Sequence, residues 1–136
     1  MSTRTITLTG RPPVRIQEDA WPLIASASEK EFEGEFDWQS FRTTKWFLGV
    51  RTAFSHEDAR AVVYARYTHD TQWRSERSYS AARGVLIDSA DPPRICEAVN
   101  EVAADIATAE HCSDHAERWR GLAHDCIADL PAVALD

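Results

Sequence analysis

The sequence predicts a single α+β domain spanning residues 1–136, in which helices pack on one face of an antiparallel sheet of about five strands. Segments of alternating apolar and polar residues, joined by short turns, are densest between residues 41 and 87, and the longest helical periodicities follow residue 91. Strands joined by short turns, with helices grouped after them, are typical of α+β domains. The expected order is strand, strand, helix, strand, strand, strand, helix, helix. A chain of 136 residues has the length of one domain.

Residues 44–54 and 60–69 are expected to pair as neighbouring strands. In the first segment Trp46, Leu48 and Val50 fall on one face, because successive strand residues point to opposite sides of a sheet. The second segment is rich in β-branched and aromatic residues, which favour strands. A short polar break between them suits a hairpin connection.

Three further strand segments are expected around this pair. A polar strand should run over residues 73–87, with Gly84 as a bulge or bend. Residues 5–9 and 14–16 should form a hairpin. Two prolines follow Gly10, and proline cannot sit inside a central ladder, so we expect this hairpin at a sheet edge.

Residues 18–27 predict a helix. Glu18 and Asp19 suit a helix start, and Pro22 is tolerated in a first turn. Residues 29–38 follow as an acidic stretch with interleaved aromatic residues. We interpret it as a solvated loop whose aromatic rings pack under the sheet, the alternative being an acidic and aromatic surface that binds a basic partner.

Two amphipathic helices are expected at the C-terminal end. Asp91 is a suitable N-cap and Pro92 a suitable first-turn residue. An apolar stripe at helical spacing follows, formed by Ile95, Val99, Val102 and Ile106. The second helix should cover residues 115–130, with an inner face formed by Trp119, Leu122, Ala123, Cys126 and Ile127.

Charge is distributed unevenly along the chain. The net charge of −7 combines +4 over residues 41–83 with −8 over residues 84–136 and −3 over residues 1–40. An acidic molecule argues against generic attachment to nucleic acid, because phosphate attraction dominates such binding. The distribution favours a basic protein partner, or a local basic patch used against the overall field.

The sequence carries no motif for catalysis or for a bound cofactor, and we expect neither, nor an enzyme. His111, Cys112 and His115, with His124 and Cys126, offer ligand atoms for zinc, but the paired-cysteine spacing of zinc sites is missing and a capped helix start explains the same residues. We therefore expect no metal. Three scattered cysteines do not make a disulfide framework, and a cytoplasmic location without membrane contact is expected.

The predicted sheet is the best candidate binding surface. Basic and aromatic residues are interleaved on it: Lys45, Arg51, Arg60, Arg66, Arg74, Arg77 and Arg83 with Phe47, Tyr64, Tyr67, Trp73 and Tyr79. Such a surface can grip single-stranded nucleic acid, and the same residue types anchor protein interfaces. Alternatively, these arginines pair with carboxylates on neighbouring strands and helices.

The chain resembles small accessory proteins carried on proteobacterial plasmids and other mobile elements. The resemblance rests on residues 5–16 with Trp21-Pro22, on the hairpin around Val50-Arg51 and Val62-Val63-Tyr64, and on residues 127–131. It carries no catalytic motif and transfers no functional residue. It implies a setting in which small acidic proteins often act as anti-CRISPR or anti-restriction inhibitors that occupy the nucleic-acid surface of a host protein.

These observations favour a non-enzymatic, anti-CRISPR-like inhibitor of a phage or plasmid that binds a host protein or ribonucleoprotein complex, such as a CRISPR effector. The alternative is a small regulator that binds nucleic acid through the sheet. Self-association into a homodimer would also close an open sheet face. The candidate binding residues are an anchoring set on the sheet and a phosphate-mimicking set on the helices: Tyr64, Arg66, Trp73, Arg74 and Arg77, and Glu97, Glu101, Asp105 and Glu110.

Overall fold

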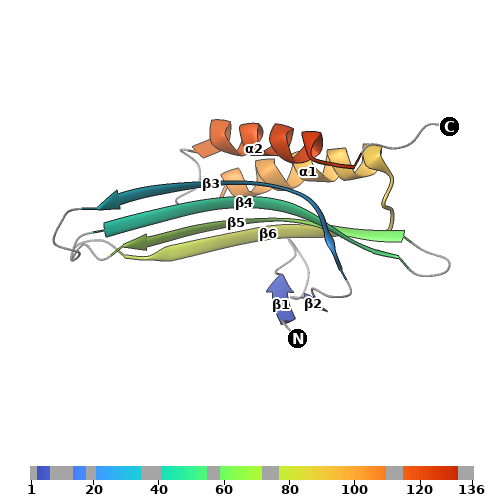
Figure 1. Cartoon of the computed structure of the whole chain (residues 1–136), viewed down its shortest axis with the longest axis horizontal. Helices are drawn as coiled ribbons and strands as arrows, with labels where there is room; N and C mark the ends of the chain where they lie inside the picture. The colour runs from blue at the N-terminus through green and yellow to red at the C-terminus, as the bar shows by residue number, and fades with distance from the viewer. Residues whose placement is uncertain are drawn as a thin grey trace.

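The α+β class is confirmed by the computed structural model, which describes residues 3–6, 14–17, 21–34, 41–54, 59–71, 77–109 and 115–131. Six strands precede two helices in this part of the chain (Figure 1). The main sheet is an antiparallel meander in the order β3-β4-β5-β6. Its strands are β3 (Leu23–Gly34), β4 (Phe41–Phe54), β5 (Ala59–Thr71) and β6 (Tyr79–Ile87).

The other elements lie on opposite sides of this sheet. Helices α1 (Pro92–Ala107) and α2 (Ala116–Ala128) cover one face, which we call the helix face (Figure 1). Strands β1 (Thr3–Ile6) and β2 (Val14–Gln17) form a separate two-stranded hairpin on the other side, where β1 approaches β6. We call this second side the open face. It carries the side chains that alternate with the buried ones along each strand.

The main core lies between the helix face and the helices. Trp46, Leu48 and Val50 of β4 are at most 1% exposed there, as the alternation in the sequence predicted. The predicted α1 stripe is also buried, and so are Trp119, Leu122, Ala123 and Cys126 of α2. A smaller cluster lies on the open face, where Val62 and Tyr64 pack with Trp21, Phe47 and Leu86.

The helix predicted over residues 18–27 is wrong where the structure describes it. Residues 23–34 form β3, which pairs with β4 from Leu23 to Gly34. Ala25 and Ala27 alternate with serines, so the small apolar residues face the helices and are buried. The backbone N–H of Thr52 also donates to the carbonyl of Pro22 at 3.1 Å, which ties the start of β3 to β4. Residues 29–34, interpreted as loop, continue this strand.

Smaller differences concern strand limits and sheet membership. The sequence predicted about five strands in one sheet, whereas the described residues form two sheets, because β1 pairs with β2 and not with the edge of the main sheet. The β6 strand starts at Tyr79, and residues 72–76 lie outside the described residues. Gly84 pairs in regular register with Tyr64, and the register shift falls instead between Leu23 and Ala25.

Candidate functional site

A basic cluster lies on the open face of the main sheet. Lys30 of β3 stands directly opposite Lys45 of β4, and both side chains are exposed. Arg66 of β5 stands opposite Phe47, which is two residues beyond Lys45 on β4, so Arg66 is diagonal to Lys45. Side chains directly opposite or diagonal on one sheet face are within reach of one another. We call Lys30, Lys45 and Arg66 the basic cluster.

No ion pair involves the basic cluster in the part of the chain that the structure describes. The arginines of the helix face behave differently. Arg42 contacts Glu33 at 3.4 Å, Arg83 contacts Asp105 at 3.8 Å, and Arg94 lies 3.7 Å from Glu97 and 3.8 Å from Glu101. The expectation that sheet arginines pair with carboxylates therefore holds for Arg42 and Arg83 on the helix face, whereas the three residues of the basic cluster form no ion pair among the described residues.

Polar and aromatic groups surround the basic cluster. Ser28 and Arg66 flank Phe47 on the neighbouring strands, and Thr68 and Ser80 continue the row of the two lysines. A Cβ built on Gly49 would lie 2.7 Å from the Phe47 ring, so the ring rests on the backbone of Gly49. The glycine therefore allows the ring to lie close against the sheet beside the cations.

Tyr64 is buried on the open face, where it contacts Phe47 and Arg51. Its ring centroid lies 5.4 Å from that of Phe47, and its hydroxyl accepts a hydrogen bond of 3.0 Å from Nε of Arg51. Arg51 also donates to the carbonyl of Trp21 at 3.0 Å. Tyr64 is 2% exposed. Its side chain thus packs against Phe47 and Arg51, and it has little exposed surface for a partner to contact.

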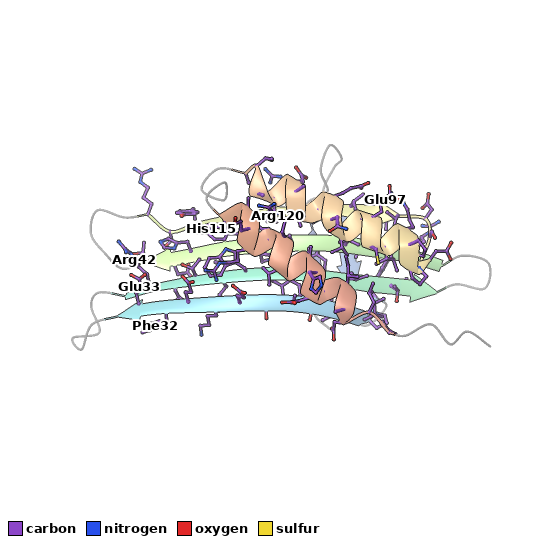
Figure 2. All side chains as sticks on the ribbon, turned by 90° about the horizontal axis from the view of Figure 1, so that it is seen from above. Phe32, Glu33, Arg42, Glu97, His115 and Arg120 are labelled. Atoms are coloured by element: carbon purple, nitrogen blue, oxygen red, sulfur yellow. The ribbon has the colours of Figure 1, made fainter. Side chains whose placement is uncertain are left out.

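Of the remaining predicted anchors, only Arg77 lies among the described residues. Arg77 is exposed just before β6, while Trp73 and Arg74 lie outside the described residues. The predicted phosphate-mimicking set is divided as well. Glu97 and Glu101 are exposed on α1 beside Arg94, Asp105 faces Arg83, and Glu110 lies outside the described residues. Figure 2 shows Glu97 and Arg120 on the helices, which cover the helix face of the sheet.

A second cluster, on the helix face, joins α2 to the sheet. The guanidinium of Arg118 lies 4.1 Å from the ring centroid of Trp46 and hydrogen bonds to Glu29 and Glu31. The pKa of Arg118 is raised, because these hydrogen bonds outweigh the opposing effect of its burial. The imidazole of His115 packs against Trp46. No local pattern in the sequence predicts this cluster, because its members lie 87 and 89 positions apart.

Groups suited to metal or thiol chemistry are not gathered among the described residues. No group of three or more His, Cys, Asp or Glu side chains there could hold a metal ion. Burial, with a smaller effect of the Asp129 and Cys96 charges, raises the pKa of the Cys126 thiol to about 12. His111 and Cys112 lie outside the described residues.

The two helices form a shallow groove of about 500 Å³. Five alanines, Asn100 and Arg120 line it: Ala103, Ala104, Ala107, Ala116 and Ala123. Neither helix is long and apolar enough to cross a membrane, and no other helix was found in the described ranges.

No family model, curated protein or solved structure matches this chain.

Proposed function

We propose that this chain is a non-enzymatic binding protein that docks the open face of its sheet against an acidic surface of a partner protein. The observation that carries the proposal is the basic cluster. Lys30, Lys45 and Arg66 lie together without an ion pair in the described residues, in a chain with 22 acidic and 15 basic side chains. Like charges placed directly opposite on a sheet destabilise it, and an acidic partner would remove that repulsion.

A protein partner fits the charge distribution better than a nucleic acid. The net charge of −7 repels a long polyanion as a whole. A partner protein can present its carboxylates only where it contacts the basic cluster. Its repulsion from the acidic residues elsewhere on this chain is then weak, because salt screens charges that are far apart. The resemblance to accessory proteins of mobile elements supports a partner in a host defence complex, which the bound chain would inhibit.

The second candidate function is binding of single-stranded nucleic acid by the same face. It is favoured by the position of Phe47, whose ring rests on Gly49 with Arg66 opposite and Lys45 on the same strand. Aromatic rings flanked by cations are the usual platform for single strands. This candidate predicts binding that is destroyed by nuclease and falls steeply with salt.

The test is a pull-down from host lysate with tagged protein, with and without nuclease. It compares the wild type with Lys45→Glu/Arg66→Glu on the open face and Glu97→Lys/Glu101→Lys on α1. The two variants change equal numbers of exposed or half-buried charges on opposite sides of the molecule. Folding of each variant is checked by circular dichroism.

We expect a nuclease-resistant protein that the open-face variant loses and the α1 variant retains. Loss of all binding after nuclease treatment would contradict docking on a protein and support binding of nucleic acid. Loss in the α1 variant alone would contradict the use of the open face and support phosphate mimicry by the acidic helix.

A further inference from the structure

The basic cluster belongs to two adjacent rows of side chains on the open face. One row crosses the four strands as Lys30, Lys45, Thr68 and Ser80, and the next crosses them as Ser28, Phe47, Arg66 and Ala82. Besides its three cations, this area therefore offers the hydroxyl groups of Ser28 and Thr68. Within the described ranges, none of these five polar side chains is in an ion pair or a hydrogen bond. The area thus presents positive charge and hydrogen-bond donors that no described group uses.

One carboxylate shares this part of the open face. Asp70 of β5 stands opposite Thr43 and is diagonal to Lys45, on the side away from Arg66. It is exposed and makes no ion pair with Lys45 in the described part of the chain. The glutamates of β3 lie on the helix face, in contact with arginines. Three cations beside one carboxylate leave an excess of positive charge at the basic cluster.

The three cations are placed so that they can converge on one anion. The Cβ atoms of directly opposite strand residues are about 5 Å apart and those of diagonal residues about 7–8 Å apart, distances that the long side chains of lysine and arginine span. Lys30, Lys45 and Arg66 come from three neighbouring strands and from two rows. Their charged ends therefore form the corners of a triangle, and an anion between them can accept a hydrogen bond from each.

A phosphoryl group in a monoester fits this triangle better than a carboxylate does. It carries a charge of about −1.5 to −2 at pH 7 and has three acceptor oxygens. A carboxylate carries a single negative charge and two oxygens, and a phosphodiester also carries a single charge. Three cations around a single negative charge would still repel one another, whereas a dianion offsets most of that repulsion.

We propose that the basic cluster binds the phosphoryl group of a phosphorylated side chain on the partner protein. The guanidinium of Arg66 would donate two parallel hydrogen bonds to phosphoryl oxygens, and the two lysines would supply positive charge. The hydroxyls of Ser28 and Thr68 can donate to the same group. This inference rests on the proposed function, because it specifies the acidic surface of the partner as a phosphorylated one.

Nuclear magnetic resonance of the full-length protein at pH 7.5 tests this preference. The probe is acetyl-Gly-phosphoserine-Gly-amide. One control is acetyl-Gly-Glu-Gly-amide, and the other is thymidylyl-thymidine, a dinucleotide with one phosphodiester. We expect the phosphoserine peptide to shift the backbone amides of Lys30, Lys45 and Arg66. It should bind at least about tenfold more tightly than either control, because it adds negative charge and a charge-assisted hydrogen bond.

Acidification separates a phosphoryl ligand from a carboxylate ligand. Because the second pKa of a phosphoryl group is about 6, the affinity of the phosphoserine peptide should fall about fourfold between pH 7.5 and pH 5.5. The glutamate peptide, with an ordinary pKa of about 4.3, should bind almost equally at both. His69, the one histidine in β3 to β6, lies on the helix face, and Asp70 faces all three probes alike. An affinity of the phosphoserine peptide that does not change with pH would contradict the inference.

Protein variants test which side chains bind the probe. Lys45→Gln removes one cation, and Arg66→Lys keeps the charge but removes the planar pair of donors. We expect each to weaken binding of the phosphoserine peptide by about fivefold or more. Arg120→Gln, at an exposed arginine of α2, is the matched control and should bind as the wild type does. Circular dichroism checks folding, and equal affinities in Lys45→Gln and Arg120→Gln would overturn the inference.

Dephosphorylation of the lysate tests whether the phosphoryl group belongs to a protein. The pull-down with tagged protein is repeated after treatment of the lysate with a protein phosphatase, and the control adds the phosphatase together with its inhibitor. We expect the partner in the control alone. A partner captured equally from both lysates would overturn the inference and leave the proposed function intact. Capture that Lys45→Glu/Arg66→Glu does not reduce would instead contradict the proposed function.

The peptide titration decides the phosphoryl preference whatever the lysate yields. Equal affinities for the three probes, or shifts confined to amides of the helices, would overturn the inference. Tighter binding of thymidylyl-thymidine than of the phosphoserine peptide would also overturn it, in favour of nucleic acid.

Discussion

Lys30 and Lys45 face each other directly across the strands β3 and β4, on the side of the sheet turned away from the helices. Arg66 lies diagonal to Lys45 on β5. On the helix face, by contrast, Arg42, Arg83 and Arg118 each contact a carboxylate. Among the described residues, these arginines on the helix side of the sheet are thus paired with carboxylates, whereas Lys30, Lys45 and Arg66 on the open face are in no ion pair.

Removing one lysine of the facing pair should stabilise the fold. Lys45→Thr replaces a repelled cation by a good strand former, and we expect a gain of about 0.2–1 kcal/mol in the free energy of unfolding, together with weaker partner binding. Urea denaturation measures the gain. In a Lys30→Thr background the gain should fall to the part that comes from strand propensity, because the repulsion between the two lysines is already absent. An equal gain in both backgrounds would show that the two lysines do not interact.

Removing Arg118 should loosen the contact between α2 and the sheet. Arg118→Ala deletes the cation over Trp46 and leaves Glu29 and Glu31 without their shared guanidinium. We expect a loss of about 1 kcal/mol or more, from the cation–π contact and from carboxylate repulsion. Arg120→Ala, on the exposed side of the same helix, is the control and should change stability by less than about 0.5 kcal/mol. Equal losses in the two variants would contradict this account.

The fold was predictable wherever a local pattern decides burial. Alternation placed Trp46, Leu48 and Val50 on the core side of β4, and helical spacing placed Val99 and Ile106 in the α1 core. Both patterns depend only on residues near one another in the chain.

The region of β3 was mispredicted because its local pattern is ambiguous. Alanines and serines near Trp21 and Pro22 are compatible with a first helical turn, and pairing with β4 decides the outcome. The same error affected the prediction of the candidate site. Lys30 enters the basic cluster only once residues 29–34 are a strand, so the sequence pointed to Lys45 and Arg66 and missed Lys30, which lies opposite Lys45.

Adding a methyl group at Gly49 should displace the Phe47 ring. The new Cβ would lie 2.7 Å from that ring, closer than carbon atoms normally approach. We expect Gly49→Ala to cost about 1–3 kcal/mol of stability, since the ring must leave its contact with Tyr64. In a Phe47→Ala background most of this cost should vanish, and thermal unfolding of the four proteins measures the coupling. Additive effects would show that the ring does not fill this space.

Alkaline pH should destabilise the protein through Cys126. Burial raises the pKa of its thiol from an ordinary value of 9.0 to about 12. The stability linked to the protonated thiol is therefore complete below about pH 9 and is lost as the pH rises towards 12, by roughly 1.4 kcal/mol per pH unit. Urea midpoints between pH 7 and 10.5 should fall less steeply in Cys126→Ala than in the wild type.

Labelling provides the control for the Cys126 prediction. Iodoacetamide should leave Cys126 unmodified in the folded protein at pH 8 and modify it in urea. The thiolate is the form that reacts, and burial in the folded protein keeps the thiol protonated and inaccessible. Equal slopes of stability against pH in Cys126→Ala and the wild type would contradict the linkage.

Photo-crosslinking of the protein to its partner tests the use of the open face most directly. A photoreactive residue replaces Lys45 in one variant and Ala104, which is exposed on the outer side of α1, in the other. Each variant is irradiated in nuclease-treated host lysate and its products are identified by mass spectrometry. We predict that position 45 forms a crosslink to one partner protein and position 104 forms none. A crosslink from position 104 alone would place the partner on the helices and contradict the proposal.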